Sequence, residues 1–299
     1  MTQAPWHGIG IDVRHTDNIL KTADIDWRIE KRALMIHGLD QQLDTHYALV
    51  RDTDDSILGI CGENYIPLQN SKAFEFFEKF VKAGSMEMEV AGSLRGGRYV
   101  FALVKINESF ILPGNDKVDG YLLISSPHVW GKAMNIRFTS VRNICSNTIL
   151  STLSTKYEKF RFPHIKDFDS VAMKTAEETL NLSKLCFNRF KKQATFLSQR
   201  TFTPAQIIEF AAEMFQGDTT VRNLRKNSVD FLEVLNDSPG CEMDSARGTW
   251  WGALNAVTYL CDHKIGYSAD TRLFQAWYGE KEVMKRRALD LALKYAKEG

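Results

Sequence analysis

The chain has 299 residues, of which 44% are hydrophobic and 25% are charged, and its net charge at pH 7 is +1. These proportions are typical of a globular protein and, with 18 Phe residues available for a core, exclude wholesale disorder. No segment approaches the roughly 20 apolar residues of a membrane-spanning helix, and the N-terminal segment MTQAPWHGIGIDVRH lacks the basic and apolar regions of a secretory signal, so we expect a cytoplasmic protein with no membrane partner.

The first half of the chain is predicted to contain short strands and one helix. The segments HYALV and ILGIC flank the polar turn RDTDDS and are typical of a β-hairpin. A helix is expected to follow, with Asn70 or Ser71 as its N-cap and Gly84 as its stop. Next, MEMEVAG alternates apolar and acidic side chains as a half-buried strand does, and a second hairpin turns at Gly96 and Gly97.

The second half changes to the helical period. Apolar residues recur at spacings of three and four over residues 171–197, which predicts one long amphipathic helix. The segment TPAQIIEFAAEMF begins with a capping box, with Thr203 as N-cap and Gln206 as the third helical residue. GTWWGALNAVTYLCDH and EVMKRRALDLALKYAKEG predict two further helices. The sequence therefore predicts an α+β fold, with an α+β domain at residues 1–168 and a helical domain at residues 169–299.

Charge is unevenly distributed along the chain. Residues 40–90 contain ten acidic and four basic side chains, whereas residues 128–166 contain seven basic and one acidic. A concentration of positive charge favours an anionic partner on one face, and it equally suits an acidic surface on a second subunit.

The basic segment also carries aromatic side chains. Cations that neutralise phosphates beside rings that stack on bases are what a single-stranded nucleic-acid site requires. In this hypothesis the hairpin tip at Gly96 and Gly97 adds two arginines, and Trp130 or Phe138 stacks on bases. The alternative is that the aromatic residues belong to the core and the basic residues to a solvated face. The candidate nucleic-acid-binding residues are Arg95, Arg98, Trp130, Lys132, Arg137, Phe138, Arg142, Lys156, Lys159 and Arg161.

A polar run, RNICSNT, ends the strand MNIRFT. The side chains of Asn143, Ser146, Asn147 and Thr148 can hydrogen-bond to their own backbone and end the strand, which explains most of them. The same amides, together with Arg142, could instead position a phosphate or the edge of a base. Local backbone capping is the simpler interpretation.

The sequence gives little indication of a catalytic or metal site. The sequence contains no GxxxxGK[ST] loop and no complete dinucleotide fingerprint. The five cysteines form no CxxC pair and the seven histidines are scattered, so neither a disulfide framework nor a metal centre is expected. Cys145 is a nucleophile candidate that needs a base nearby, and Asp262 with His263 is a ligand candidate; ordinary structural roles are favoured for both. We therefore predict a non-enzymatic protein with no cofactor.

Several longer motifs resemble a known family. YIPLQNSKAFEFFEKFV, AGSLRGGRYVFALVKI, SVRNICSNTILSTL and ARGTWWGALNAVTYLCDH look like the phage/plasmid-like family of uncharacterised proteins, over about Trp6 to Lys297. In the usual form of the family, a hydrophobic residue takes the position of Asn143 and an Asn takes the position of Ser146. This difference argues against a ligand role for these two residues. The first-half order of hairpins around a helix is also similar to the β-β-β-α core of phage single-strand annealing proteins such as RecT, Erf and Red-beta.

The resemblance implies a mobile-element setting, and with it a location in the host cytoplasm. We expect a homo-oligomeric protein that binds or anneals single-stranded DNA in recombination or replication. The rival expectation is an oligomeric accessory or anti-defence protein that acts on host or phage proteins, with the acidic and basic regions pairing between subunits.

Overall fold

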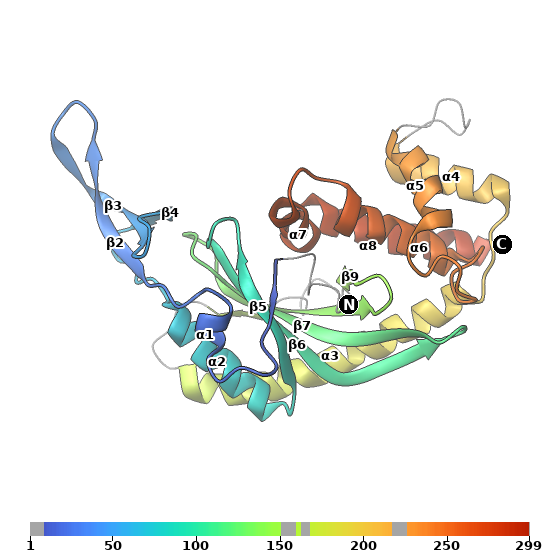
Figure 1. Cartoon of the computed structure of the whole chain (residues 1–299), viewed down its shortest axis with the longest axis horizontal. Helices are drawn as coiled ribbons and strands as arrows, with labels where there is room; N and C mark the ends of the chain where they lie inside the picture. The colour runs from blue at the N-terminus through green and yellow to red at the C-terminus, as the bar shows by residue number, and fades with distance from the viewer. Residues whose placement is uncertain (1–8, 151–159, 163–167, 217–225, 299) are drawn as a thin grey trace. The chain divides into compact units, whose positions relative to one another are not determined.

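The computed structural model describes residues 9–150, 160–162, 168–216 and 226–298. It confirms the α+β fold, with antiparallel strands in the first half and helices in the second (Figure 1). The strands are β1 (Ile11–Asp12), β2 (Ile29–Ile36), β3 (Gln41–Arg51), β4 (Ile57–Gly62), β5 (Glu87–Leu94), β6 (Tyr99–Leu112), β7 (Asp116–Pro127), β8 (Met134–Arg142), β9 (Asn147–Leu150) and β10 (Phe160–Phe162). The helices are α1 (Ile19–Thr22), α2 (Asn70–Ala83), α3 (Phe168–Ser198), α4 (Pro204–Phe215), α5 (Lys226–Asp237), α6 (Trp250–Tyr259), the π-helix η3 (Leu260–Lys264), α7 (Ala269–Tyr278) and α8 (Glu280–Glu298).

The strands form two sheets. The larger has the order β1-β5-β6-β7-β8-β10, with β9 paired to β8, and the smaller has the order β2-β3-β4. Most neighbours in the larger sheet are also neighbours in sequence, which is the arrangement of a meander. Its long strands β6 and β7 are rich in buried aliphatic residues because both faces of the sheet are covered along much of their length.

The chain folds into two compact units, each made of three stretches. The first comprises Met1–Asn107, Leu122–Arg137 and Lys156–Leu182, and the second comprises Glu108–Tyr121, Phe138–Thr155 and Ser183–Gly299. Strands β6, β7 and β8 therefore each contribute residues to both units, and the division differs from the single boundary near residue 168 that the sequence suggests.

Local signals in the sequence predicted several elements correctly. The expected hairpin is β3–β4, with His46 opposite Gly62 and Val50 opposite Ile57. The capping box of α4 is formed, with the Thr203 side chain accepting from the Gln206 backbone. These features depend on residues close in sequence, so they could be recognised without tertiary information.

In the first unit one expectation needs correction and one strand was not predicted. The N-cap of α2 is Gln69, whereas Asn70 is the first helical residue and is buried. Strand β2 was missed, because its sequence IEKRALMI has three charged residues near its start and no strict alternation. Among the described helices, none combines the length and the apolar composition that crossing a bilayer requires.

Candidate nucleic-acid interface

Two loops of the first unit are joined by a backbone hydrogen bond. The turn between β5 and β6 carries Arg95 and Arg98, and the segment that follows β7 carries Trp130 and Lys132. The His128 backbone N–H donates to the carbonyl of Arg98 at 2.8 Å, which holds the two loops side by side. Four of the predicted nucleic-acid-binding residues therefore share one small region of the molecule.

The turn between β5 and β6 depends on a close approach to Trp27. Gly97 has a φ of 93°, and a Cβ atom there would lie 3.0 Å from Cζ2 of Trp27. The indole has two further neighbours, since the Arg51 guanidinium lies 5.4 Å from its ring and the His128 imidazole meets it edge-on at 5.5 Å. The turn thus rests on a packed aromatic support and requires a glycine on both steric and backbone grounds.

His128 is part of a buried polar connection beneath the loops. Its Nε2 lies 2.8 Å from Oδ1 of Asn70, and the Asn70 side chain donates to the carbonyl of Ile25 at 2.9 Å. Both side chains are almost fully buried, at 2% and 1% exposure. A buried hydrogen-bonded pair of this kind fixes the backbone on either side of it, so the loop that carries Trp130 has a defined position.

The exposed side chains of these loops form a mixed cationic and aromatic surface. We call it the Trp130 patch and define it by Arg95, Arg98, Trp130 and Lys132, all of which are exposed. The Trp130 indole is 54% exposed and meets the His46 ring edge-on at 5.9 Å. The exposed part of this indole is available for stacking on a planar ligand, and the two joined loops also carry three exposed cations.

The structure removes two residues from the predicted interface. Phe138 is 7% exposed and its ring packs edge-on against Phe187 at 6.1 Å, so it belongs to the core and cannot stack on a base. Arg142 is 2% exposed and forms an ion pair with Asp116, so it cannot contact a phosphate. Both predictions were wrong because the side chains face inward from β8.

The described part of the structure does not place the remaining candidates in the Trp130 patch. Arg137 is half-buried on β8. Arg161 is placed only as a strand residue, with its backbone opposite Asn135 of β8. Lys156 and Lys159 lie outside the described residues.

Arg142 is the centre of a buried cluster in the second unit, which we call the Asp116 cluster: Asp116, Arg142, Ser245 and Trp251. The Arg142 Nε donates to both carboxylate oxygens of Asp116, at 2.8 and 2.9 Å. Oδ2 of the same carboxylate accepts from Oγ of Ser245 at 2.7 Å and from the Trp251 indole at 2.9 Å. Burial is the largest single influence and lowers the pKa of Arg142, but the hydrogen bonds to Asp116, the charge of Asp116 and the interactions with Cys145 together outweigh it, so the pKa is raised.

A second buried cluster joins β9 to the C-terminal helices. We call it the Lys285 cluster: Thr148, Asp262 and Lys285. The Lys285 ammonium donates to Asp262 and to Oγ1 of Thr148, both at 2.8 Å. The other carboxylate oxygen of Asp262 accepts from the Thr148 backbone N–H at 2.7 Å. Asp262 lies in the π-helix η3, whose wider turn changes the direction of its side chain relative to a continuous α-helix.

The polar run RNICSNT therefore has an architectural role. Beside the two clusters, the Asn147 amide donates to Oγ1 of Thr258 at 2.9 Å and to the Asn255 carbonyl at 3.1 Å. These bonds link the β8–β9 hairpin to α6, more than a hundred residues later in sequence. The expectation of purely local capping is too narrow, because the side chains at Asn147 and Thr148 bond mainly to distant elements.

Of the cysteine and histidine candidates in the second unit, Cys145 is buried and His263 is half-buried. Burial raises the pKa of the Cys145 thiol to about 11, so the thiol is protonated at neutral pH and is a poor nucleophile. His263 lies 2.9 Å from the carbonyl oxygen of Cys145, not from its sulfur, and burial lowers the pKa of this imidazole. The Asp262 carboxylate forms an ion pair with Lys285. The residues that the structure describes contain no group of three or more potential metal ligands.

This burial predicts a specific order of thiol modification. In the native protein at neutral pH, iodoacetamide is expected to alkylate Cys241, the half-buried cysteine, well before the buried Cys145 and Cys261, because the reagent reaches only an exposed sulfur. Burial raises the thiol pKa of all three, to about 11 for Cys145 and about 12 for Cys261. Peptide mass spectrometry at several reaction times measures the order. Fast native alkylation of Cys145 would show that its thiol is accessible and activated, and would restore the nucleophile hypothesis.

No local signal in the sequence points to the partners that bury these charges. Asp116 lies in the turn NDKVDG, which has the composition of a solvated loop, and Ser245 and Lys285 lie in the helical half. The separation between Asp116 and Trp251 is 135 residues, so their contact could not be inferred from spacing.

Comparison of the sequence with models of protein families gives a family assignment. Residues 57–288 match the model of a family described as a domain of unknown function, DUF932. The chain belongs to the DUF932 family. No curated protein and no solved structure matches it at a significant level.

The DUF932 region begins at β4 and ends within α8. It includes both loops of the Trp130 patch and every member of the Asp116 and Lys285 clusters. Strands β2 and β3 precede it. The buried clusters of this chain thus lie within its DUF932 region, whereas most of the smaller sheet lies outside that region.

Proposed function

We propose that this protein binds single-stranded DNA through the Trp130 patch and promotes annealing of complementary strands, without covalent chemistry. The observation that carries the proposal is the exposed indole of Trp130, on a loop hydrogen-bonded to a turn that carries two arginines. Single-stranded sites use this combination, because any base can stack on an aromatic ring while cations follow the phosphates.

The rigidity of the loops supports the proposal. A stacking residue is most effective when it is held in place before the ligand arrives, since ordering it on binding costs free energy. The packing of Gly97 on Trp27 and the bond between His128 and Asn70 provide this order. The conformation of the two loops is therefore already defined before a ligand binds.

The order of elements and the sequence motifs support a phage or plasmid setting. The first-half order, in which antiparallel hairpins stand on either side of α2, is the basis of the resemblance to the β-β-β-α core of phage annealing proteins, and the motifs resemble a phage/plasmid-like family. We propose on this basis that the protein acts in recombination or replication of a mobile element, in the cytoplasm of the host.

A titration at several salt concentrations tests DNA binding. Fluorescence anisotropy of a labelled oligonucleotide is expected to show tighter binding of single-stranded than of double-stranded DNA, with affinity falling as salt rises. The double variant Arg98→Gln/Lys132→Gln is expected to reduce the slope of log affinity against log salt by about 1.4, since each phosphate contact on a single strand contributes about 0.7. Binding that is independent of salt would contradict the proposal. The matched control is Lys82→Gln/Lys184→Gln, at two exposed lysines outside the patch, which should keep the wild-type slope.

Trp130→Ala is expected to weaken single-stranded DNA binding by about 5- to 150-fold, because base–aromatic stacking contributes about 1–3 kcal/mol. The salt slope should be unchanged, since no cation is removed. Tyr267→Ala is the control, because Tyr267 is fully exposed and lies outside the patch. An equal effect of the two substitutions would show that Trp130 is not a stacking platform.

A second candidate function is supported by the smaller sheet. Ile57 and Ile60 of β4 and the nearby Ile66 are 60%, 51% and 73% exposed. Exposed aliphatic side chains that are close in sequence favour a protein partner, as expected for an accessory or anti-defence protein. Gel filtration before and after addition of single-stranded DNA separates the two functions, because only the DNA-binding protein elutes with the oligonucleotide.

A further inference from the structure

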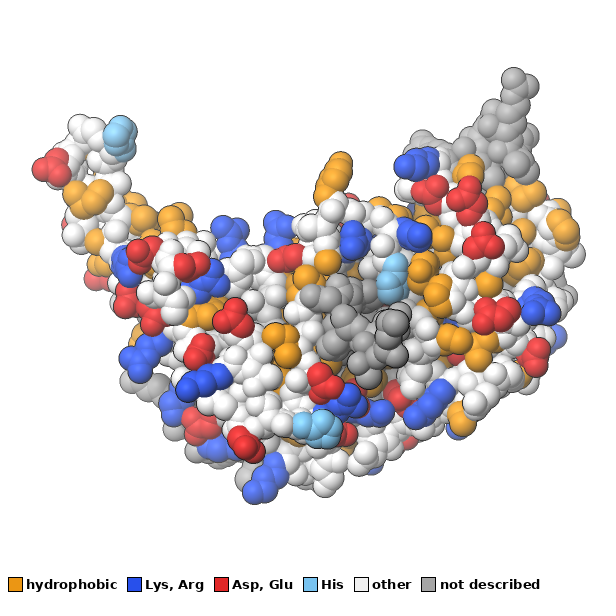
Figure 2. Space-filling model, in the orientation of Figure 1, with side chains coloured by type: hydrophobic (Ala, Val, Ile, Leu, Met, Phe, Trp, Pro, Cys, Tyr) orange, Lys and Arg blue, Asp and Glu red, His pale blue; other side chains and the backbone are white. Residues whose placement is uncertain are grey.

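The C-terminal part of α3 carries positive charge only. Residues 188–200 contain four basic side chains and no acidic one. The four are exposed, and none forms an ion pair with a residue that the structure describes. On most of the face drawn in Figure 2, Lys and Arg side chains are interspersed with Asp and Glu. We call this segment the α3 basic face and define it by Arg189, Lys191, Lys192 and Arg200.

The opposite side of the same segment is held in the core of the second unit. Phe190, Ala194 and Leu197 recur at spacings of four and three, and all have 0% exposure. The Phe190 ring lies 6.2 Å from that of Phe110 and 6.0 Å from that of Trp251. Because this apolar stripe is packed, the helix cannot turn about its axis and the cations stay on the solvent side.

Three of the four cations follow one line along the helix. Lys192 is three residues after Arg189, Phe196 is four residues after Lys192, and Arg200 is four residues after Phe196, which are the spacings of neighbours on a helix surface. The Arg200 guanidinium lies 5.2 Å from the centre of the Phe196 ring, so it is held just beyond the helix end. At about 1.5 Å per residue, the row is roughly 15 Å long.

The composition of the α3 basic face favours a nucleic acid over a membrane or a protein. A helix that lies on a membrane presents its apolar side to lipid, whereas the apolar stripe of this segment is buried. A protein interface has an apolar core and is depleted in Lys. On the described part of α3 the one exposed large apolar side chain is Leu185, four residues before the face begins. Phosphates require cations alone.

The same composition favours a duplex over a single strand. No aromatic ring of residues 188–200 is exposed, because Phe190 is buried and Phe196 is half-buried beside Arg200. Bases therefore cannot stack on this face, and attraction depends on charge density. Double-stranded DNA carries one negative charge per about 1.7 Å of its axis, about twice the density of one strand.

We propose that the α3 basic face binds the phosphate backbone of double-stranded DNA, whatever its base sequence. The face belongs to the second unit and shares no residue with the Trp130 patch of the first, so the proposal does not rest on the single-stranded site. A chain with both surfaces holds the two forms of DNA that annealing connects, a single strand as substrate and a duplex as product.

A salt titration with a labelled blunt-ended duplex tests the proposal. The variant Arg189→Gln/Lys192→Gln/Arg200→Gln is expected to lower duplex affinity by at least about tenfold at low salt and to reduce the slope of log affinity against log salt by about 2–3, since each phosphate contact on B-DNA contributes about 0.9. Because the three side chains are exposed, thermal unfolding of the variant should match that of the wild type. Duplexes of unrelated sequence should bind equally.

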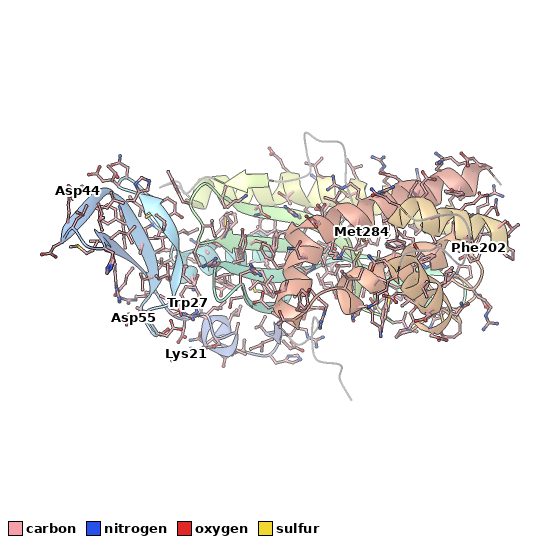
Figure 3. All side chains as sticks on the ribbon, turned by 90° about the horizontal axis from the view of Figure 1, so that it is seen from above. Lys21, Trp27, Asp44, Asp55, Phe202 and Met284 are labelled. Carbon is pink, nitrogen blue, oxygen red and sulfur yellow. The ribbon has the colours of Figure 1, made fainter. Side chains whose placement is uncertain are left out.

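The matched control removes the same charge elsewhere. Lys21→Gln/Lys82→Gln/Lys297→Gln changes three exposed lysines outside the face, and Lys21 is labelled in Figure 3. This control should keep the wild-type duplex affinity and slope. An equal loss in the two triple variants would show that net charge, and not the α3 basic face, attracts the duplex, and would overturn the proposal.

The two DNA surfaces can fail separately. Trp130→Ala should leave duplex affinity unchanged within about twofold, because the duplex offers no free base to stack on the indole. The α3 triple variant should still form the single-strand adduct at the peptide that contains Trp130. Loss of duplex binding in Trp130→Ala would mean that one surface binds both forms, and would overturn the second site.

Other partners give different results in the same variants. Binding of the wild type to phosphatidylserine vesicles but not to duplex DNA, lost in the α3 triple variant, would assign the face to a membrane. A fall in solution mass by light scattering in that variant, again without duplex binding, would assign it to a contact between subunits. Either result would refute the proposal.

Discussion

Replacement of Asp116 by alanine is expected to lower the free energy of unfolding by about 3–5 kcal/mol. The substitution leaves the Arg142 guanidinium buried without its carboxylate, and it also removes the acceptor of the Ser245 hydroxyl and the Trp251 indole. A buried charge that loses its partner is costly because water cannot reach it. The measurement is urea unfolding followed by tryptophan fluorescence, to which Trp251 contributes.

The control for this substitution is an exposed pair on α2. Glu75→Gln breaks the surface contacts of Glu75 with Lys72 and Lys79 and should cost no more than about 0.5 kcal/mol. The double variant Asp116→Leu/Arg142→Met should recover part of the stability lost by Asp116→Ala, because it removes both charges. If Asp116→Ala were as mild as Glu75→Gln, Arg142 would have to reach solvent, and its removal from the predicted DNA interface would be unjustified.

Replacement of Lys285 by methionine is the second substitution that we expect to lower stability strongly. Methionine keeps much of the length of the side chain but leaves Asp262 without a cation, so the free energy of unfolding is expected to fall by about 3–5 kcal/mol. Thermal or urea unfolding measures the loss. Adding Asp262→Asn should restore part of it, since the amide oxygen can still accept from the Thr148 backbone while the unpaired negative charge is removed.

This pair of variants distinguishes a buried charge from lost packing. If Lys285→Met/Asp262→Asn were no more stable than Lys285→Met, the cost would come from packing around the methionine and not from the isolated carboxylate. Because the Lys285 cluster connects β9 with η3 and α8, its loss should also expose these elements to faster hydrogen exchange.

The sequence predicted what local patterns determine. Hairpin β3–β4 and the start of α4 follow from turn residues and a capping box, and the α+β fold follows from the change of hydrophobic period. Strand β8 is instructive because its alternation already placed Phe138 on the same side as the apolar Met134 and Ile136. All three are buried, so a strict use of that periodicity would have kept Phe138 out of the interface.

Local sequence patterns cannot predict buried ion pairs. A count of bases in residues 128–166 treats Arg142 and Lys132 alike, yet one is buried against Asp116 and the other is exposed. The difference arises from a partner 26 residues earlier in the chain and from the helices that cover it. Charge patterning therefore located a candidate region for an interface but could not choose its residues.

Photo-cross-linking tests the proposed DNA interface most directly. A single-stranded oligonucleotide containing bromodeoxyuridine, bound to the wild-type protein and irradiated, is expected to form its main adduct in the peptide that contains Trp130, and Trp130→Ala should lose this adduct. The control Tyr267→Ala should retain it. Adducts confined to peptides outside the Trp130 patch, or the absence of any adduct at saturating DNA, would contradict the assignment of this surface as the single-stranded DNA site.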